Sequence, residues 1–147
     1  MKVVGRRKQV AFLLAFLFLP LCVNATDIEF NSVNPFGVIQ SGDNYNHVTL
    51  RDSALVNMTG GSAISFDMLD YSVANIFGGD PGTLGMWGNA TAHIYGKSFD
   101  ISTVVNGWLI SGNWADNSAF SILYRVNSFG PVPGSLDSPI VLHTIPE

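Results

Sequence analysis

The stretch SALVNMTGG, Ser53 to Gly61, decides the fold because it returns twice along the chain at a constant spacing. Eighteen residues later the sequence reads YSVANIFGG (Tyr71 to Gly79), and 18 beyond that it reads NATAHIYGK (Asn89 to Lys97). Self-similarity at a fixed period indicates a repeat architecture, in which each unit packs mainly against its neighbours. The repeat predicts three copies of one structural unit, in the blocks 44–61, 62–79 and 80–97.

Each block carries two apolar pairs whose members are two residues apart, which is the period of a β-strand. The first pair is Val48/Leu50, Phe66/Met68 and Leu84/Met86; the second is Val56/Met58, Ala74/Ile76 and Ala92/Ile94. Short strands, glycine corners and this short period are typical of one coil of a β-solenoid. We therefore predict an all-β fold: a small parallel β-solenoid (β-helix) of about three to four 18-residue coils with a C-terminal β-hairpin cap. Met58, Ile76 and Ile94 should then touch in sequence inside the stack.

Two other folds remain open at this point. An ordinary β-sandwich could carry the same short strands by chance. A three-sided left-handed helix of hexapeptides also has an 18-residue coil, but here the apolar pairs lie eight residues apart instead of at a regular six. That spacing favours a flattened or irregular right-handed coil and leaves the hand undecided.

Residues 1–25 have the pattern of a signal peptide. A basic start precedes the apolar run VAFLLAFLFLPLCV, and the small residues of VNA predict cleavage after Ala25. The run is about 14 residues, shorter than the ~20 that a membrane-spanning helix needs, so an uncleaved anchor is the weaker alternative. A lipoprotein attached at Cys22 is also disfavoured, because Leu21 stands where a small residue is required. We expect export by the Sec pathway, with signal peptidase as a transient partner, and a secreted or cell-surface location.

Four of the seven cations leave with this segment, so residues 26–147 keep three cations against eleven acids, a net charge of −8. Such a surface repels phosphate backbones and argues against nucleic acid as a partner. The only Cys also lies in the predicted signal peptide, which leaves no disulfide to brace the exported chain. Its stability must come from packing and backbone hydrogen bonds.

The flanks of the repeats are expected to cover the ends of the stack, which would otherwise expose open strand edges. Residues 26–43 are predicted to form an N-terminal cap or a degenerate coil. Residues 98–147 are predicted to form a capping hairpin, a loop and a terminal strand. Within them, apolar and polar residues alternate along GWLISGNWADNSAFSILYRV on both sides of a loop at 116–118, which predicts the hairpin. We expect a surface loop at SFGPVPGSLDSP and a last strand at IVLHTI.

Two columns of the repeat are candidates for function. Exposed aromatic side chains could stack on sugar rings; these candidate glycan-binding residues are Tyr71, Phe77, Trp87 and Tyr95. The alternative is that the ends of the chain fold over them. Asn57, Asn75 and His93 share another column, for which a hydrogen-bonded ladder is favoured over a polar binding stripe.

Signals for catalysis or metal binding are weak. Asp52 and Asp70 share a column and could offer oxygen ligands to Ca²⁺, but Gly88 interrupts it and no calcium-binding repeat is present, which favours solvated turn acids. Histidine pairs at zinc-site spacing, a nucleophile elbow and a phosphate-binding loop are all absent from the sequence. We expect a non-enzymatic protein with no catalytic residue, metal or cofactor; a polysaccharide lyase or hydrolase is a distant alternative.

The coils resemble the "DSS-TVNI-GG" coils of bacterial exported PEP-CTERM proteins. The matching residues run from Asp52 to Gly61, Asp70 to Gly79 and Gly88 to Lys97. The segment that follows the coils in that family is similar to LISGNWADNSAF (Leu109 to Phe120). The family's approach to its sorting motif is similar to IVLHTIPE (Ile140 to Glu147). The family's next Pro, membrane helix and basic tail do not follow Glu147, so we expect either a truncated sequence or a member that escapes anchoring.

The resemblance implies a surface or matrix protein of a Gram-negative bacterium. It also implies handling by an exosortase and association with extracellular polysaccharide and biofilm. A glycan-binding module or adhesin is the alternative function.

Overall fold

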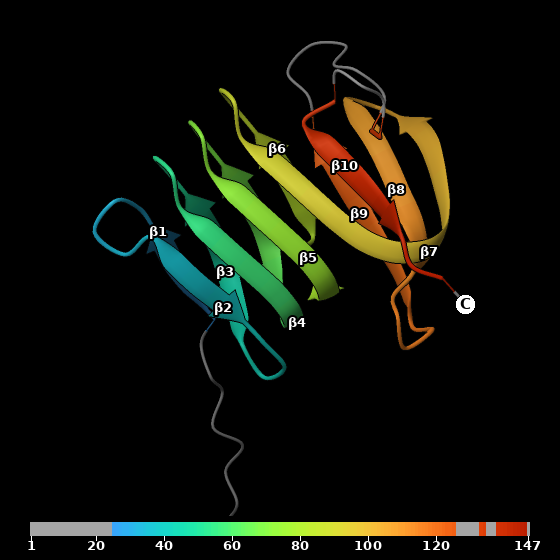
Figure 1. The fold of residues 1–147 in the computed structure, drawn as a ribbon, viewed down its shortest axis with the longest axis horizontal. Coiled ribbons are helices and arrows are strands. Elements are labelled where there is room, and N and C mark those ends of the chain that lie inside the picture. The colour runs from blue at the N-terminus through green and yellow to red at the C-terminus, as the bar shows by residue number, and fades with distance from the viewer. Residues whose placement is uncertain (1–24, 126–132, 135–137, 147) are drawn as a thin grey trace, which may run out of the picture.

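Successive coils pair strand on strand in parallel, as the 18-residue period predicts. The computed structural model describes residues 25–125, 133–134 and 138–146. It is all-β, with stacked parallel coils of about 18 residues that form a β-solenoid of about four turns. Figure 1 shows the strands side by side from β1 at one end to β7 at the other. This confirms the predicted fold class and rules out the β-sandwich; residues 1–24 of the predicted signal peptide and most of the predicted loop 128–139 lie outside the described residues.

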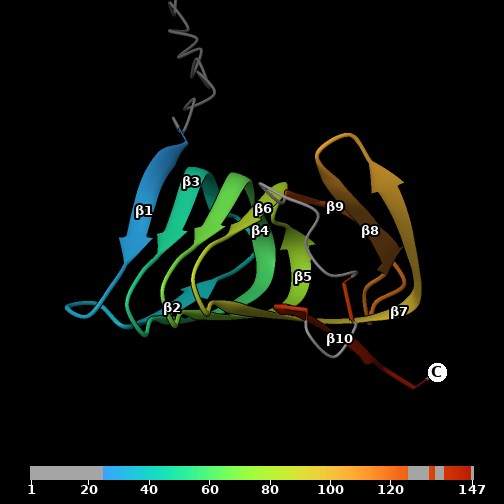
Figure 2. The same cartoon turned by 90° about the horizontal axis from the view of Figure 1, so that it is seen from above.

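Each coil contributes one strand to each of two facing layers, which we call face A and face B; one strand within a face is a rung. Figure 2 shows the two layers, with β1 and β3 in one and β2 in the other. Face A contains β1 (Thr26–Phe30), β3 (Asn44–Leu50), the second half of β4 (Leu55–Met68), β6 (Thr83–Met86) and the end of β9 (Ala119–Arg125). Face B contains β2 (Phe36–Ile39), the first half of β4, β5 (Val73–Asp80), the first half of β7 (Thr91–Val104) and β10 (Ile140–Thr144).

The core fills the space between the two faces. On face B, Met58 pairs with Ile76 and Ile76 with Ile94, and all three side chains are fully buried, so the predicted contact in sequence is confirmed. On face A the equivalent file runs from Val48 through Phe66 and Leu84 to Tyr124. Each large aliphatic side chain buried in this way contributes about 1.5–3 kcal/mol, so repeating the coil is what makes its inner side stable.

Both kinds of corner place a residue in the left-handed backbone region. At one corner the column is Asp52, Asp70 and Gly88, with φ of 57°, 58° and 73°. The Asp70 carboxylate accepts the backbone N–H of Asp52 at 3.1 Å, so this acid ties one coil to the previous one. At the other corner Gly79 has φ 89°, and a Cβ there would lie 2.6 Å from the carbonyl oxygen of Gly60. Glycine is therefore required by both the conformation and the close approach of the coils.

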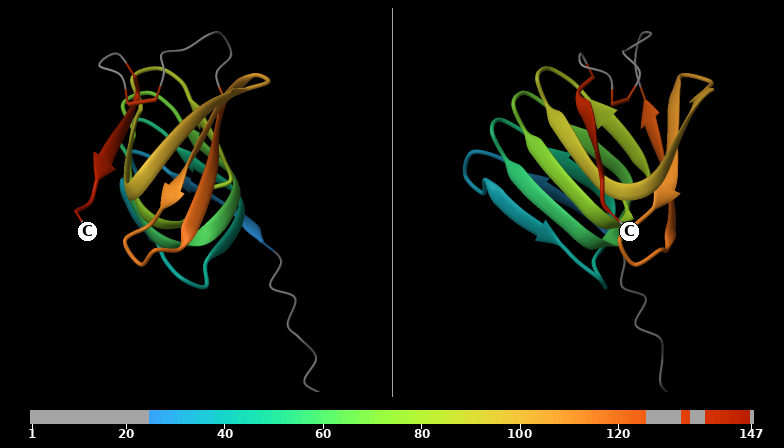
Figure 3. Two further views of the ribbon diagram at one scale, coloured as in Figure 1. Left: turned by 90° about the vertical axis from the view of Figure 1, so that its right-hand side faces the viewer. Right: turned by 45° about the vertical axis from the view of Figure 1, so that its right-hand side comes forward.

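The C-terminal end is closed by antiparallel strands. Beyond Gly96, β7 leaves face B and pairs with β8 (Gly107–Asn113), which pairs in turn with β9 (Figure 3). The predicted hairpin with its loop at 116–118 is confirmed. The extension of β7 into a third strand of this cap was not predicted, and neither was the return of β9 and β10 to the stack as parallel rungs on β6 and β7.

At the N-terminal end, residues 26–43 carry β1 and β2, which pair in parallel with β3 and β4. The offset to the next coil is 20 residues between Phe30 and Leu50 and 19 between Ile39 and Met58. This segment has the form of a coil whose spacing departs slightly from the repeat.

Candidate functional site

The four candidate aromatic residues do not form a single strip. Tyr71 is 67 % exposed in the turn after β4, and Trp87 is 43 % exposed directly after β6 on face A. Phe77 and Tyr95 lie on face B. The structure thus brings together only the last two of the predicted residues.

Phe77 and Tyr95 belong to a stack of three rings on neighbouring rungs. The ring centroids of Phe77 and Tyr95 are 4.4 Å apart, and those of Tyr95 and His143 are 4.3 Å apart, with nearly parallel planes in both pairs. Both faces of the Tyr95 ring are therefore covered by protein, which leaves its edge for any ligand. His143 was missed in the sequence because it pairs with Tyr95 only through the return of β10.

The polar column beside this stack bonds to itself, as the ladder interpretation predicts. The Asn75 side-chain amide donates to Asn57 Oδ1 at 2.9 Å. His93 follows in register, but its Nδ1 shares a hydrogen bond with His143 Nε2, also at 2.9 Å. Burial, followed by the charge of His143, lowers the pKa of His93. The side chains of this column therefore join β4 to β5 and β7 to β10.

Face A carries an open groove of about 400 Å³ that crosses four rungs. The polar and aromatic residues that line it are His47 of β3, Ser65 and Asp67 of β4, Thr83 of β6, Trp87, and Arg125 of β9. They form two adjacent columns, because Ser65 pairs with His47 and Thr83, whereas Gly85 pairs with Asp67 and Arg125. The exposed side chain of Ile64 lies at the rim.

Gly85 makes room for the indole of Trp87 in this groove. A Cβ at Gly85 would lie 2.5 Å from Cη2 of Trp87 and 2.6 Å from Oδ1 of Asp67, so the ring lies over the backbone where a side chain would otherwise stand. The Ser65 hydroxyl donates to Oδ2 of Asp67 at 2.7 Å, which fixes the carboxylate beside the ring. An exposed aromatic plane, an oriented acid and a cation thus share one surface.

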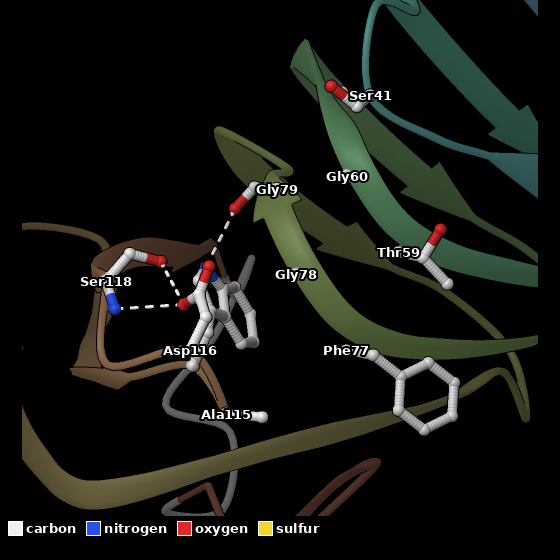
Figure 4. Close-up of a pocket in the computed structure, with 11 residues that line it drawn as sticks. Ser41, Thr59, Gly60, Phe77, Gly78, Gly79, Ala115, Asp116 and Ser118 are labelled. Carbon is white, nitrogen blue, oxygen red and sulfur yellow. Dashed lines mark hydrogen bonds between the residues drawn. The ribbon is translucent and has the colours of Figure 1, made fainter.

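A second open pocket of about 400 Å³ lies where the glycine corners of the coils meet the β8–β9 loop. Figure 4 shows Thr59 and Phe77 on the coil side of this pocket and Asp116 and Ser118 on the cap side. The Asp116 carboxylate accepts the hydroxyl of Ser118 at 2.6 Å and its backbone N–H at 2.9 Å, and these bonds lower the pKa of Asp116.

The neighbouring Trp114 ties the cap to the coils. Its Nε1–H donates to the Gly79 carbonyl at 3.1 Å, and its ring stacks on Phe120. The indole N–H of Trp114 therefore bonds the cap to the coils, whereas the Asp116–Ser118 bonds lie within the loop of the cap.

Among the described residues, no group of three or more His, Cys, Asp or Glu side chains could hold a metal ion. The described part of the chain contains no helix long and apolar enough to cross a membrane. Searches against family models, curated proteins and solved structures found no match to this chain.

Proposed function

We propose that this chain is a non-enzymatic exported protein of a Gram-negative bacterium that is associated with extracellular polysaccharide at the cell surface or in a biofilm matrix. The signal-peptide pattern of residues 1–25 supports export, and the similarity of the coils to PEP-CTERM proteins supports the setting and the exosortase as a further partner.

One structural observation carries the non-enzymatic part of the proposal. The two acids that the sequence offered as metal ligands bond to the backbone, since Asp52 accepts the N–H of Ser32 and Asp70 accepts that of Asp52. His93 of the polar column bonds to His143. A group bonded into the fold in this way is a poor starting point for acid–base work, which needs a side chain free to exchange a proton with substrate. The coils therefore act as a rigid spacer between the two ends of the chain.

The test uses the protein expressed with its leader in a Gram-negative host. We expect the chain to reach the medium or the outer surface, and the purified protein to co-sediment with isolated exopolysaccharide without shortening it. Retention in the cytoplasm would contradict export. Cleavage of acidic polysaccharides that is lost in Asp52→Asn or Asp70→Asn would contradict the non-enzymatic role.

The second candidate function is a glycan-binding module or adhesin, and the exposed indole over Gly85 is the observation that favours it. A glycan array compares the wild type with Trp87→Ala and with the face B variants Phe77→Ala and Tyr95→Ala. Binding that is unchanged in all three variants would count against these aromatic residues as the site, and no glycan binding by the wild type would leave only the spacer role.

A further inference from the structure

We propose that the face A groove is a binding site for a neutral, hexose-containing oligosaccharide that stacks on Trp87 and lies along the solenoid axis. The inference rests on the proposed association with polysaccharide and adds to it a location and a ligand class.

The first step is the platform. Sugar rings present a C–H face that packs well on an aromatic plane, and an indole offers the largest such plane. Trp87 is 43 % exposed, and its ring lies over Gly85, where even a methyl group would collide with it. Tyr95, in contrast, has both ring faces covered. Trp87 is therefore the better platform of the two.

The second step is the pair of charged groups on either side of the platform. Asp67 and Arg125 are the two register neighbours of Gly85, so they flank the indole on adjacent rungs. A carboxylate accepts two hydroxyl protons and a guanidinium donates from a planar fork, so each group can bond hydroxyls at one edge of a sugar ring that stacks on the indole between them. The bond from Ser65 holds the Asp67 carboxylate in place before any ligand arrives. Orientation in advance reduces the entropy lost on binding.

The third step is the length of the groove. His47, Ser65 and Thr83 form a row of polar side chains on three successive rungs, and Arg125 lies on a fourth. At the ordinary strand spacing, four rungs span about 14 Å, which exceeds one sugar ring. The row therefore suits a short oligosaccharide running along the solenoid axis, with the platform toward the C-terminal end.

The fourth step is charge. The groove contains one acid, Asp67, and one cation, Arg125, which balance each other. The predicted exported chain as a whole has a net charge of −8, so a polyanion would approach against the surrounding field. A neutral sugar encounters no such barrier. We therefore assign the groove to neutral saccharides rather than to polyuronates.

The experiment measures binding of cellohexaose, as a neutral probe, and of hexa-uronate oligomers by isothermal titration calorimetry on the full exported chain. We expect binding of the neutral probe and at least about tenfold weaker binding in Trp87→Ala, the loss of about 1.4 kcal/mol that a stacking platform supplies. Asp67→Asn keeps the shape of the side chain but accepts hydroxyl protons less well. The affinity of this variant for the probe should therefore fall less than that of Trp87→Ala. Phe36→Ala, which removes an exposed aromatic of β2 on face B, away from the groove, should bind as the wild type does.

Thermal unfolding of each variant shows whether it is folded, and Trp87→Phe provides a second variant that keeps a smaller platform. Equal affinity of the wild type, Trp87→Ala and Trp87→Phe would overturn the site, and preference for the uronate would overturn the ligand class. If the wild type co-sediments with exopolysaccharide but does not bind cellohexaose, this inference fails and the proposed function stands. If it binds neither, the proposed association with polysaccharide fails as well.

Discussion

Ser72 should destabilise the protein, and replacing it by Ala should make the fold more stable. Its side chain is fully buried in the file that it shares with Ala54 and Ala90 of the neighbouring coils, and its Oγ has no hydrogen-bond partner among the described residues. Its backbone N–H and C=O, in contrast, bond to Leu69 and Thr91. The substitution Ser72→Ala would remove the orphaned hydroxyl and leave the backbone contacts in place.

The expected gain follows from two opposing terms. A buried hydroxyl without a partner costs about 1–3 kcal/mol in lost hydration. Removing one oxygen leaves a void of about 10 Å³, which costs about 0.2 kcal/mol at the usual rate per unit of cavity volume. The free energy of unfolding should therefore rise by about 0.8–2.8 kcal/mol. For a chain of about 120 residues the unfolding entropy is about 0.25 kcal/mol per degree, so Tm should rise by about 3–11 °C.

Urea denaturation and calorimetry of the wild type and Ser72→Ala measure this gain, with an unchanged m-value as the sign that only stability has altered. The matched control is Ala54→Ser, which places a second hydroxyl in the same buried file and should destabilise the protein by a similar amount. If Ser72→Ala is less stable than the wild type while Ala54→Ser is neutral, hydroxyl groups in this file find partners and the reasoning is refuted.

Three further perturbations test other parts of the stack. Ile76→Ala should lower the free energy of unfolding by about 2–5 kcal/mol in urea melts, because the side chain is fully buried between two others of its file; a loss under about 1 kcal/mol would show that the stack can collapse around the cavity. Gly79→Ala should destabilise more than Gly42→Ala, since both have positive φ but only the first Cβ meets backbone atoms, at 2.6–2.7 Å; equal losses in thermal melts would mean that conformation alone is responsible. The folded protein lowers the pKa of His93 from its ordinary 6.5, so the unfolded chain binds more protons and stability should fall as pH drops from 7 to 5. His93→Asn, which would extend the amide ladder from Asn75, should reduce that fall, and identical pH profiles for the two proteins would exclude His93 as its source.

The stacked part of the fold was predictable because each coil repeats its inward residues at one spacing. The file through Met58, Ile76 and Ile94 and the bond between Asn57 and Asn75 both follow from aligning the blocks. The return of the C-terminal strands was not predictable in this way. β10 pairs with β7 across 48 residues, from Ile94 to Leu142, and neither the period nor a turn signal joins them.

The candidate site also combines features that the sequence predicts with features that only the folded chain creates. Alternation within a strand correctly turned Phe77 and Trp87 outward, but these residues lie on different faces, because one follows the face B pair of its coil and the other the face A pair. A local signal for the groove did exist, in the small outward residue Gly85 two positions before a Trp. The presence of Arg125 beside that Trp depends on the return of β9, which only the folded chain reveals.

The parallel register of the coils also bears on how such a protein can change size. Because the top of one coil matches the bottom of the next, an in-frame duplication of 18 codons would insert a whole coil without disturbing those on either side. Loss of the same unit would shorten the molecule just as cleanly. Unequal recombination within the gene thus offers a ready way to vary the distance between the two ends while the closing strands stay the same.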